Sequence, residues 1–125
     1  MKKVLVTGGL GFIGSNLIKI LLSKNYFVIN LDNLSYSANF YNSKDFNHSK
    51  KYKFIKCDLN NKSKILTILN KFKPRTIFNL AAETHVDRSI DGPESFIKSN
   101  IFGVFNLLQS FRKYLLKNKN SKKAF

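Results

Sequence analysis

Residues 4–14 have the sequence VLVTGGLGFIG, in which a short apolar run ends at a cluster of glycines. The run Val4 to Val6 predicts a β-strand. The apolar residues that follow recur at helical spacing, at positions 13, 17, 20 and 21. Such spacing buries one face of a helix. The stretch therefore predicts a strand, a tight turn and a helix in direct succession.

The turn contains glycines at positions 8, 11 and 14, and each position favours glycine for a different physical reason. Gly8 lets the chain turn sharply out of the strand, because glycine tolerates backbone conformations closed to other residues. Gly11 lets the backbone approach a pyrophosphate without an intervening Cβ, and Gly14 lets the helix lie close to the sheet. The pyrophosphate would then rest on free N–H groups at the helix start. The alternative is a glycine turn with a purely structural role.

An acidic residue stands where a dinucleotide-binding turn needs one. Asp32 follows Gly14 by eighteen positions and ends a second predicted strand, residues 26–31. A carboxylate there can accept hydrogen bonds from the ribose hydroxyls of adenosine, and it would repel the 2′-phosphate of NADP. No Lys or Arg occupies positions 33–35 to offset that repulsion. The sequence therefore predicts NAD as the cofactor, in preference to NADP.

The rest of the chain continues the alternation of strands and helices. Residues 53–57 and 76–82 predict two more strands, and apolar positions between 65 and 72 predict a helix. The long polar stretch 33–51 predicts a connection. An apolar stripe predicts a long amphipathic helix that faces either the core or a partner: Ile97, Ile101, Val104, Leu108, Phe111 and Leu115. We therefore expect an α/β fold, namely a partial Rossmann-type doubly wound parallel sheet of about four strands with flanking helices.

Composition narrows the class of protein. The formal net charge is +15 over 125 residues, and the 43% hydrophobic content is typical of one folded domain. The charge comes from scattered lysines, whereas Arg, the better reader of bases and phosphates, is scarce, so we expect no nucleic-acid partner. No apolar run approaches the ~20 residues of a membrane span or forms a secretion signal. We expect a cytoplasmic protein with no membrane association, no metal site and a buried structural thiol at Cys57.

Four segments resemble one family. The G-x-x-G-x-x-G spacing of residues 8–14 is similar to that of the extended short-chain dehydrogenase/reductase superfamily. Residues 79–90, NLAAETHVDRSI, resemble the A-A-E-S-H-V-D-R-S-I segment of the dTDP-glucose 4,6-dehydratases. Residues 32–39, DNLSYSAN, resemble their D-x-L-T-Y-A-G-N segment, and residues 100–103, NIFG, resemble their N-I-x-G at the start of a long helix. The resemblance thus covers essentially the whole chain.

The resemblance implies which residues surround the cofactor. The phosphate turn comprises Gly8, Gly11, Phe12, Ile13 and Gly14, and the adenosine ribose would lie against Asp32, Asn33, Leu34 and Ser35. Adenine would lie near Asp58 and Leu59. Leu80, Ala81 and Ala82 would lie beneath the dinucleotide, and Ser99 would lie at its edge. Asp58 would accept a hydrogen bond from the adenine amino group or, as the alternative, cap the helix that follows.

The resemblance places the substrate beside Thr84 and His85. Thr84 stands where the family usually has Ser, and Ala38 stands where it usually has Gly, so the substrate loop departs from the family pattern. His85, Asp87 and Arg88 put a base, an acid and a cation close together in the sequence. This group allows a catalytic role or, as the alternative, a loop braced by an Asp–Arg pair.

The resemblance also implies a reaction, the conversion of dTDP-glucose to dTDP-4-keto-6-deoxyglucose by a lyase. NAD takes hydride from C4 of the hexose, water is eliminated across C5 and C6, and the hydride returns to C6. The resemblance places the family's catalytic Thr-Asp-Glu run on a fifth strand and its Tyr-x-x-x-Lys pair on the helix after it, both expected beyond residue 125, and Ala124-Phe125 looks like the approach to that further strand. We therefore expect residues 1–125 to form an incomplete NAD-binding Rossmann domain, truncated before the fifth strand, without catalytic residues or a substrate domain and inactive alone.

Two other classes of function stay open. The chain could come from another nucleotide-sugar dehydratase or epimerase on the same scaffold, or it could be a non-enzymatic dinucleotide-binding module. For the full-length enzyme, the resemblance implies a nucleotide-sugar substrate, dTDP-glucose, and a homodimer.

Overall fold

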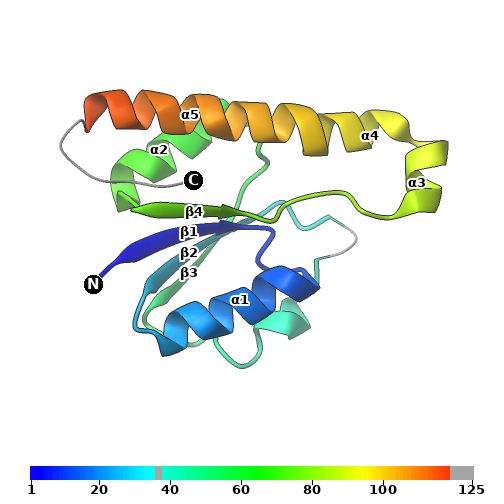
Figure 1. The fold of residues 1–125 in the computed structure, drawn as a ribbon. Coiled ribbons are helices and arrows are strands. Elements are labelled where there is room, and N and C mark those ends of the chain that lie inside the picture. Colours follow the sequence, from blue (N-terminus) through cyan, green and yellow to red (C-terminus); the bar gives the residue numbers. More distant parts are fainter. Residues whose placement is uncertain (36–37, 119–125) are drawn as a thin grey trace.

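A parallel sheet organises residues 1–35 and 38–118, which are the residues that the computed structural model describes (Figure 1). Its four strands are β1 (Lys3–Thr7), β2 (Phe27–Asp32), β3 (Tyr52–Lys56) and β4 (Thr76–Asn79). Their order in the sheet is β3-β2-β1-β4, so the chain builds outwards from β1 to β3 and then crosses to the opposite side of β1. This crossing creates a topological switch point between β1 and β4, where open α/β sheets bind ligands.

Helices cover both faces of the sheet (Figure 1). The helix α1 (Phe12–Ser23) links β1 to β2 on one face. On the other face α2 (Lys62–Phe72) links β3 to β4 and packs beside α5 (Gly103–Lys117). Each helix returns the chain to the end of the sheet from which the next parallel strand must start. The predicted fold class, a Rossmann-type doubly wound parallel sheet with flanking helices, is confirmed.

The strands divide their side chains between two hydrophobic cores. In β1, Leu5 belongs to the core beneath α2 and α5, whereas Val4 and Val6 belong to the core beneath α1, together with Ile18 and Leu21. Successive residues of a strand point to opposite faces, so a strand that is covered on both faces must be apolar at every position. This requirement explains why a short apolar run was sufficient to predict β1.

The strand β4 ends at Asn79, so the prediction that it continues to Ala82 is wrong. The N–H groups of Leu80 and Ala81 both turn towards the hydroxyl oxygen of Thr7, at 3.1 Å each. The N–H of Leu80 also donates to the backbone carbonyl of Thr7 at 3.2 Å, so the ladder that joins β4 to β1, whose last register pair is Thr7 with Asn79, ends at this hydrogen bond. Residues 80–85 continue as an irregular segment along the end of the sheet.

The predicted connection 33–51 contains one turn of 3-10 helix, η1 (Phe40–Ser43). The side chain of Asn39 caps this turn by accepting a hydrogen bond from the N–H of Tyr41. Residues 36–37, which belong to the segment that resembles the family, lie outside the described residues. The predicted approach to a further strand at Ala124 and Phe125 also lies outside them.

The last part of the chain forms a long helical rod. It consists of α4 (Pro93–Ile97), a π-helical segment η2 (Lys98–Phe102) and α5, and the short helix α3 (Val86–Asp91) precedes it. The predicted amphipathic helix is therefore present. The π-helical segment η2 interrupts it, and π-helical turns frequently occur at functional sites.

The apolar stripe, which was predicted to face either the core or a partner, is not uniformly buried on this rod. Ile97, Ile101 and Leu108 are 46%, 60% and 44% exposed. The buried face of α5 is instead formed by Gly103, Asn106, Leu107, Ser110, Phe111 and Tyr114. Apolar residues occur on several sides of α5, so periodicity alone did not select a face. Small and polar residues, which a count of apolar positions ignores, line the face that packs against α2.

None of the helices in the described part of the chain is long and apolar enough to cross a membrane.

Cys57 is buried directly after β3, as predicted. Burial raises the pKa of the Cys57 thiol, which disfavours the nucleophilic thiolate.

Replacing two neighbouring leucines tests the orientation of α5. Leu107 is fully buried, so Leu107→Ala should lower the free energy of unfolding by about 3 kcal/mol through lost burial and a residual cavity. Leu108 is 44% exposed, so Leu108→Ala should cost less than about 1 kcal/mol. Urea unfolding monitored by circular dichroism measures both effects. Equal losses, or a larger loss for Leu108→Ala, would contradict the observed orientation.

Candidate functional site

A cleft of about 580 Å³ lies at the carboxyl ends of the strands, around the switch point between β1 and β4. It is lined by the turn after β1, the ends of β2 and β3, the segment after β4 and the helical rod. The cofactor residues predicted from the sequence line this cleft with one exception, Leu34. The substrate residue Thr84 also lines it, but His85 does not. Lining residues absent from the predicted site are Leu31, Ala38, Cys57, Asn60, Glu83, Ser95 and Lys98.

Residues 8–14, here called the glycine turn, fit tightly against their surroundings. Gly8 has φ of +68°, and a Cβ at this position would lie 2.8 Å from Cα of Ala81. A Cβ at Gly14 would lie 2.3 Å from the carbonyl oxygen of Gly8 and 2.7 Å from Cα of Gly9. All three contacts are with backbone atoms, which cannot move aside cheaply. These two glycines are therefore required by packing, whatever the cleft binds.

Gly11 differs from the other glycines of the glycine turn. A Cβ there would meet only the carbonyl oxygen of Gly8, at 3.3 Å, and Gly11 lines the cleft. No side chain caps the N-terminus of α1, so the N–H groups of its first turn remain available to a ligand. Those groups carry the positive end of the helix dipole, which favours an anion such as a pyrophosphate. Gly11 is thus the least crowded of these glycines, and it lies beside a helix N-terminus that can bind an anion.

Asp32 connects the end of β2 to the glycine turn. Its Oδ2 accepts a hydrogen bond from the N–H of Leu10 at 3.1 Å, and its Oδ1 accepts one from the N–H of Leu34 at 2.9 Å. Leu34 has φ of +61°, which turns its N–H back towards the carboxylate. Leu34 therefore supports Asp32 through its backbone and does not line the cleft itself. Each carboxylate oxygen retains a further lone pair for a ligand.

The buried side chain of Asn30, in β2, holds the glycine turn in place. Oδ1 of Asn30 accepts a hydrogen bond from the N–H of Gly9 at 3.0 Å, and its Nδ2 donates to the hydroxyl of Tyr52 at 2.9 Å. Burial raises the pKa of the Tyr52 hydroxyl, so this group stays protonated. The sequence analysis missed Asn30, because the partners of its side chain come from another strand and from the glycine turn. A polar residue within an otherwise apolar buried strand is the one feature that could have indicated it.

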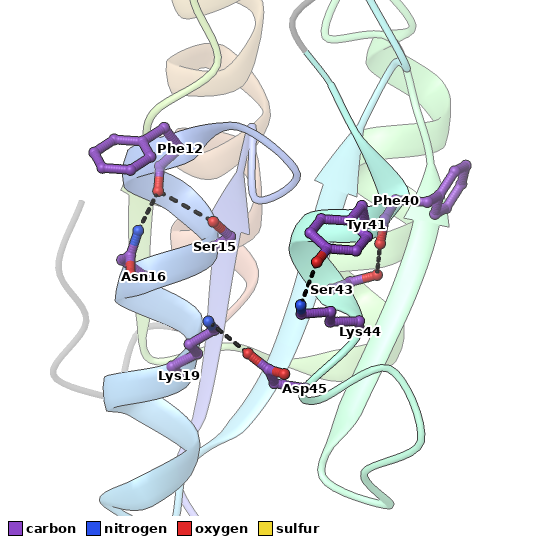
Figure 2. Close-up of polar contacts among 9 residues, drawn as sticks. All are labelled: Phe12, Ser15, Asn16, Lys19, Phe40, Tyr41, Ser43, Lys44 and Asp45. Atoms are coloured by element: carbon purple, nitrogen blue, oxygen red, sulfur yellow. Dashed lines mark hydrogen bonds and ion pairs between the residues drawn. The ribbon is translucent and has the colours of Figure 1, made fainter.

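The connection between β2 and β3 is fastened to the glycine turn and to α1. The carbonyl oxygen of Leu10 accepts hydrogen bonds from the N–H of Asn39 at 3.2 Å and from Nδ2 of Asn42 at 2.8 Å. Figure 2 shows a second attachment, the ion pair between Nζ of Lys19 in α1 and Oδ2 of Asp45, at 2.7 Å. The long connection thus braces the wall of the cleft that carries Asp32 and the glycine turn.

The segment after β4 is held at both ends. Thr7 donates a hydrogen bond to Oδ1 of Asn79 at 2.5 Å and accepts the two N–H groups of residues 80 and 81. On the far side, the amide of Asn100 pairs with the backbone of Glu83: Nδ2 donates to the carbonyl and Oδ1 accepts from the N–H, both at 2.8 Å. Asn100 belongs to the π-helical segment η2. This pairing fixes the helical rod against the cleft wall that contains Leu80, Ala81 and Ala82.

Asp58 lies at the mouth of the cleft, after β3. It does not cap α2, because the cap is Asn61, whose side chain accepts a hydrogen bond from the N–H of Lys64. The alternative interpretation of Asp58 as a helix cap is therefore wrong. Its Oδ1 accepts instead from the N–H of Asn60 at 2.9 Å and from Nδ2 of Asn60 at 3.1 Å.

His85 precedes α3 and stands outside the cleft, and it provides no side-chain cap to that helix. Asp87 and Arg88 follow it within α3, none of whose residues is buried. The catalytic interpretation of these three residues remains a prediction. Within residues 1–35 and 38–118, no group of three or more His, Cys, Asp and Glu side chains lies close enough together to hold a metal ion.

Two alanine substitutions separate the packing role of the glycine turn from its binding role. Gly14→Ala should lower the free energy of unfolding by about 2 kcal/mol or more, because its Cβ meets backbone atoms. Gly11→Ala should cost less stability than Gly14→Ala, about 1 kcal/mol, because its Cβ would meet a single atom at 3.3 Å, yet it should weaken dinucleotide binding. Thermal unfolding without ligand and calorimetric titration with NAD measure the two effects. Unchanged NAD binding by Gly11→Ala would contradict the assignment of this space to a ligand.

Comparison with known proteins agrees with this architecture. The family model described as GDP-mannose 4,6 dehydratase matches residues 5–125. A dTDP-glucose 4,6-dehydratase from Salmonella typhimurium is 42% identical over 113 residues, which cover 90% of this chain and 31% of the relative. A probable dTDP-glucose 4,6-dehydratase from Sinorhizobium fredii is 39% identical over 123 residues, covering 98% of this chain and 35% of the relative. The chain spans about a third of the length of the curated relatives it matches.

Solved structures give the same result. The dTDP-glucose 4,6-dehydratase of Bacillus anthracis, solved in complex with NAD, superimposes with a TM-score of 0.80 at 34% identity, covering 91% of this chain and 34% of that protein. The UDP-glucose 4-epimerase of Thermus thermophilus, also solved with NAD, superimposes with a TM-score of 0.78 at 34% identity, covering 90% of this chain and 34% of that protein. The resemblance to dTDP-glucose 4,6-dehydratases is confirmed at the level of sequence and fold. The family match across nearly all of its residues shows that the chain belongs to the GDP-mannose 4,6-dehydratase family.

Proposed function

We propose that residues 1–125 form the NAD-binding part of a dTDP-glucose 4,6-dehydratase. The observation that carries the proposal is the joint position of Gly11, the uncapped start of α1 and Asp32 around one cleft. Relatives that are 39% and 42% identical bear the name dTDP-glucose 4,6-dehydratase. In such an enzyme, bound NAD accepts hydride from a sugar carbon and returns it within the same catalytic cycle.

The residues of the cleft fit the parts of a dinucleotide. The N–H groups of Phe12 and Ile13 at the start of α1 would hold the pyrophosphate, and Asp32 with Asn33 and Ser35 would hold the adenosine ribose. Asp58 and Leu59 would lie beside adenine. The remaining lining residues, Leu80, Ala81, Ala82 and Ser99, would form the opposite wall. These assignments follow the predicted site, except that Leu34 acts through its backbone.

The position of Asp32 favours NAD over NADP. Two backbone N–H groups fix its carboxylate at the end of β2, and its free lone pairs can accept the ribose hydroxyls. A 2′-phosphate would place a second anion against this carboxylate. The one cation that lines the cleft within the described residues is Lys98, which belongs to the helical rod and pairs with Glu94 at 2.9 Å. The ribose end of the cleft thus offers no positive side chain to a 2′-phosphate.

The substrate we propose is dTDP-glucose. A solved dTDP-glucose 4,6-dehydratase from Streptomyces venezuelae, with NAD and the ligand TYD bound, matches 86% of this chain with a TM-score of 0.81. Here the hydroxyl of Thr84 lines the cleft and could contact the sugar, whereas His85 stands outside the cleft. Tyr52 and Lys56 have the Tyr-x-x-x-Lys spacing but lie on β3, whereas the resemblance assigns the acid–base pair to a helix. A nucleotide-sugar epimerase is the second candidate, because epimerases share the fold at similar identity.

Calorimetric titration with NAD and NADP tests the proposed function. The protein should bind NAD saturably and more tightly than NADP. Asp32→Asn keeps an acceptor for the N–H of Leu10 but removes the charge, and it should weaken NAD binding about tenfold and reduce the preference over NADP. Asp91→Asn is the matched control, since Asp91 is exposed at the end of α3 and does not line the cleft. A folded protein that binds neither dinucleotide would refute the proposal.

We also propose that the full-length enzyme is a homodimer that uses the exposed face of the helical rod. Ile97, Ile101, Phe105 and Leu108 recur at helical spacing on this face and are 44–60% exposed. A second copy of the same face would cover them, as isologous interfaces do.

The sequence-based expectation of a cytoplasmic protein stays a prediction.

Sedimentation velocity tests the proposed dimer. Ile101→Glu should shift the protein from dimer to monomer, because it places a charge in the apolar face. Ile20→Glu is the control, since Ile20 is comparably exposed but lies on α1. A monomeric unsubstituted protein, or equal effects of the two substitutions, would contradict the use of this face.

A further inference from the structure

The mouth of the cleft contains a network of side-chain amides that the proposed cofactor site does not by itself require. Asn60 follows Asp58 by two residues and lines the cleft. Its Nδ2 donates to Oδ1 of Asp58 at 3.1 Å and, more weakly, to the carbonyl oxygen of Lys98 at 3.4 Å. Its Oδ1 accepts a hydrogen bond from Nδ2 of Asn106 at 3.1 Å. One side chain thus connects the end of β3 to the helical rod at two points.

The chemistry of the partners fixes the orientation of both amides. A carboxylate and a backbone carbonyl can only accept hydrogen bonds, so the group of Asn60 that faces them must be its NH₂. Its oxygen must then face Asn106, whose NH₂ is the donor. Asn106 is buried within α5, and Gly103, one turn earlier, lets α5 approach so closely that an added Cβ would lie 3.3 Å from Cβ of Leu59. The hydrogen-bond network of Asp58, Asn60 and Asn106 is therefore anchored to a closely packed helix, α5.

The two carboxylate oxygens of Asp58 therefore differ in their hydrogen-bond partners. Oδ1 receives both donors from Asn60, the backbone N–H at 2.9 Å and the side-chain amide at 3.1 Å. Oδ2 has no hydrogen-bond donor among the residues that the structure describes. With one oxygen held, the carboxylate cannot rotate freely, and the other oxygen keeps a constant position at the cleft mouth. A fixed anionic acceptor favours a ligand group that donates protons and opposes one that only accepts.

We infer that Asn60, supported by Asn106, is a positioning residue that makes Asp58 selective for a 6-aminopurine. The inference rests on the proposed NAD site and goes beyond it, because it concerns which base the site accepts. Adenine presents an amino group at C6, which can donate to Oδ2 of Asp58. Hypoxanthine presents a carbonyl oxygen there, which would face the carboxylate without a proton between them.

The test compares NAD with nicotinamide hypoxanthine dinucleotide, whose purine carries an oxygen at C6 and a proton at N1, by calorimetric titration. The unsubstituted protein should prefer NAD by about tenfold, the value of one charge-assisted hydrogen bond. Asn60→Ala removes the side-chain donor and leaves only the backbone N–H on Oδ1 of Asp58, so it should reduce the preference to about threefold. Asn60→Asp has the same shape but turns an oxygen towards Asp58 and should nearly abolish the preference. Asn47→Ala, at an exposed asparagine outside the cleft lining, should leave it unchanged.

The outcomes separate this inference from the proposed function. If the protein binds both dinucleotides equally, or if both Asn60 variants retain the full preference while their thermal unfolding shows that they are folded, the inference is wrong and the NAD site stands. If the protein binds neither dinucleotide, the proposed function fails and the inference fails with it. A purely structural role for Asn60 would weaken the two ligands by the same factor, so a change in the ratio of the two affinities is the decisive readout.

Discussion

The glycine turn lies in a space that admits no additional atom at Gly8 or Gly14, and the arrangement of the whole cleft follows from that close packing. Gly8 touches the backbone of Ala81 after β4, and Gly14 touches the backbone of Gly8 itself. The first helix must therefore start directly over the carboxyl end of β1. This placement directs the uncapped helix N-terminus into the cleft and brings the end of β2 within hydrogen-bond distance of the turn.

Around this turn, the cleft is assembled mainly from bonds between side chains and backbone. Asp32, Asn30 and Asn42 each hold a backbone group of residues 9 or 10, and Asn100 holds the backbone of Glu83. Side-chain amides and carboxylates satisfy backbone groups that have no partner in the sheet or the helices, and an unsatisfied buried group would be costly. The same side chains therefore stabilise the fold and fix the geometry of the cleft.

The sequence predicted the elements whose pattern is local. The apolar run before Gly8, the spacing of the glycines and the acid at position 32 all lie within one strand-turn-helix-strand unit, and the cofactor residues derived from them line the cleft. The sequence left open whether the stripe on the long helix faces the core or a partner, and Ile97, Ile101 and Leu108 are exposed. Apolar residues on α5 occur on more than one side, and the face that is buried includes Gly103 and Ser110, which a search for apolar periodicity passes over.

The sequence by itself determined the order of strands and helices, the doubly wound class and the acidic partner of the glycine turn, because each depends on spacings between residues close in the chain. Only the tertiary structure decided where β4 ends, which face of α5 is buried and which asparagines build the cleft. Their partners are far away in the sequence: Asn30 holds Gly9 across 21 residues, Asn42 holds Leu10 across 32, and Asn106 holds Asn60 across 46. Contacts of this kind exist only after the sheet has brought its carboxyl ends together, so no local pattern can indicate them.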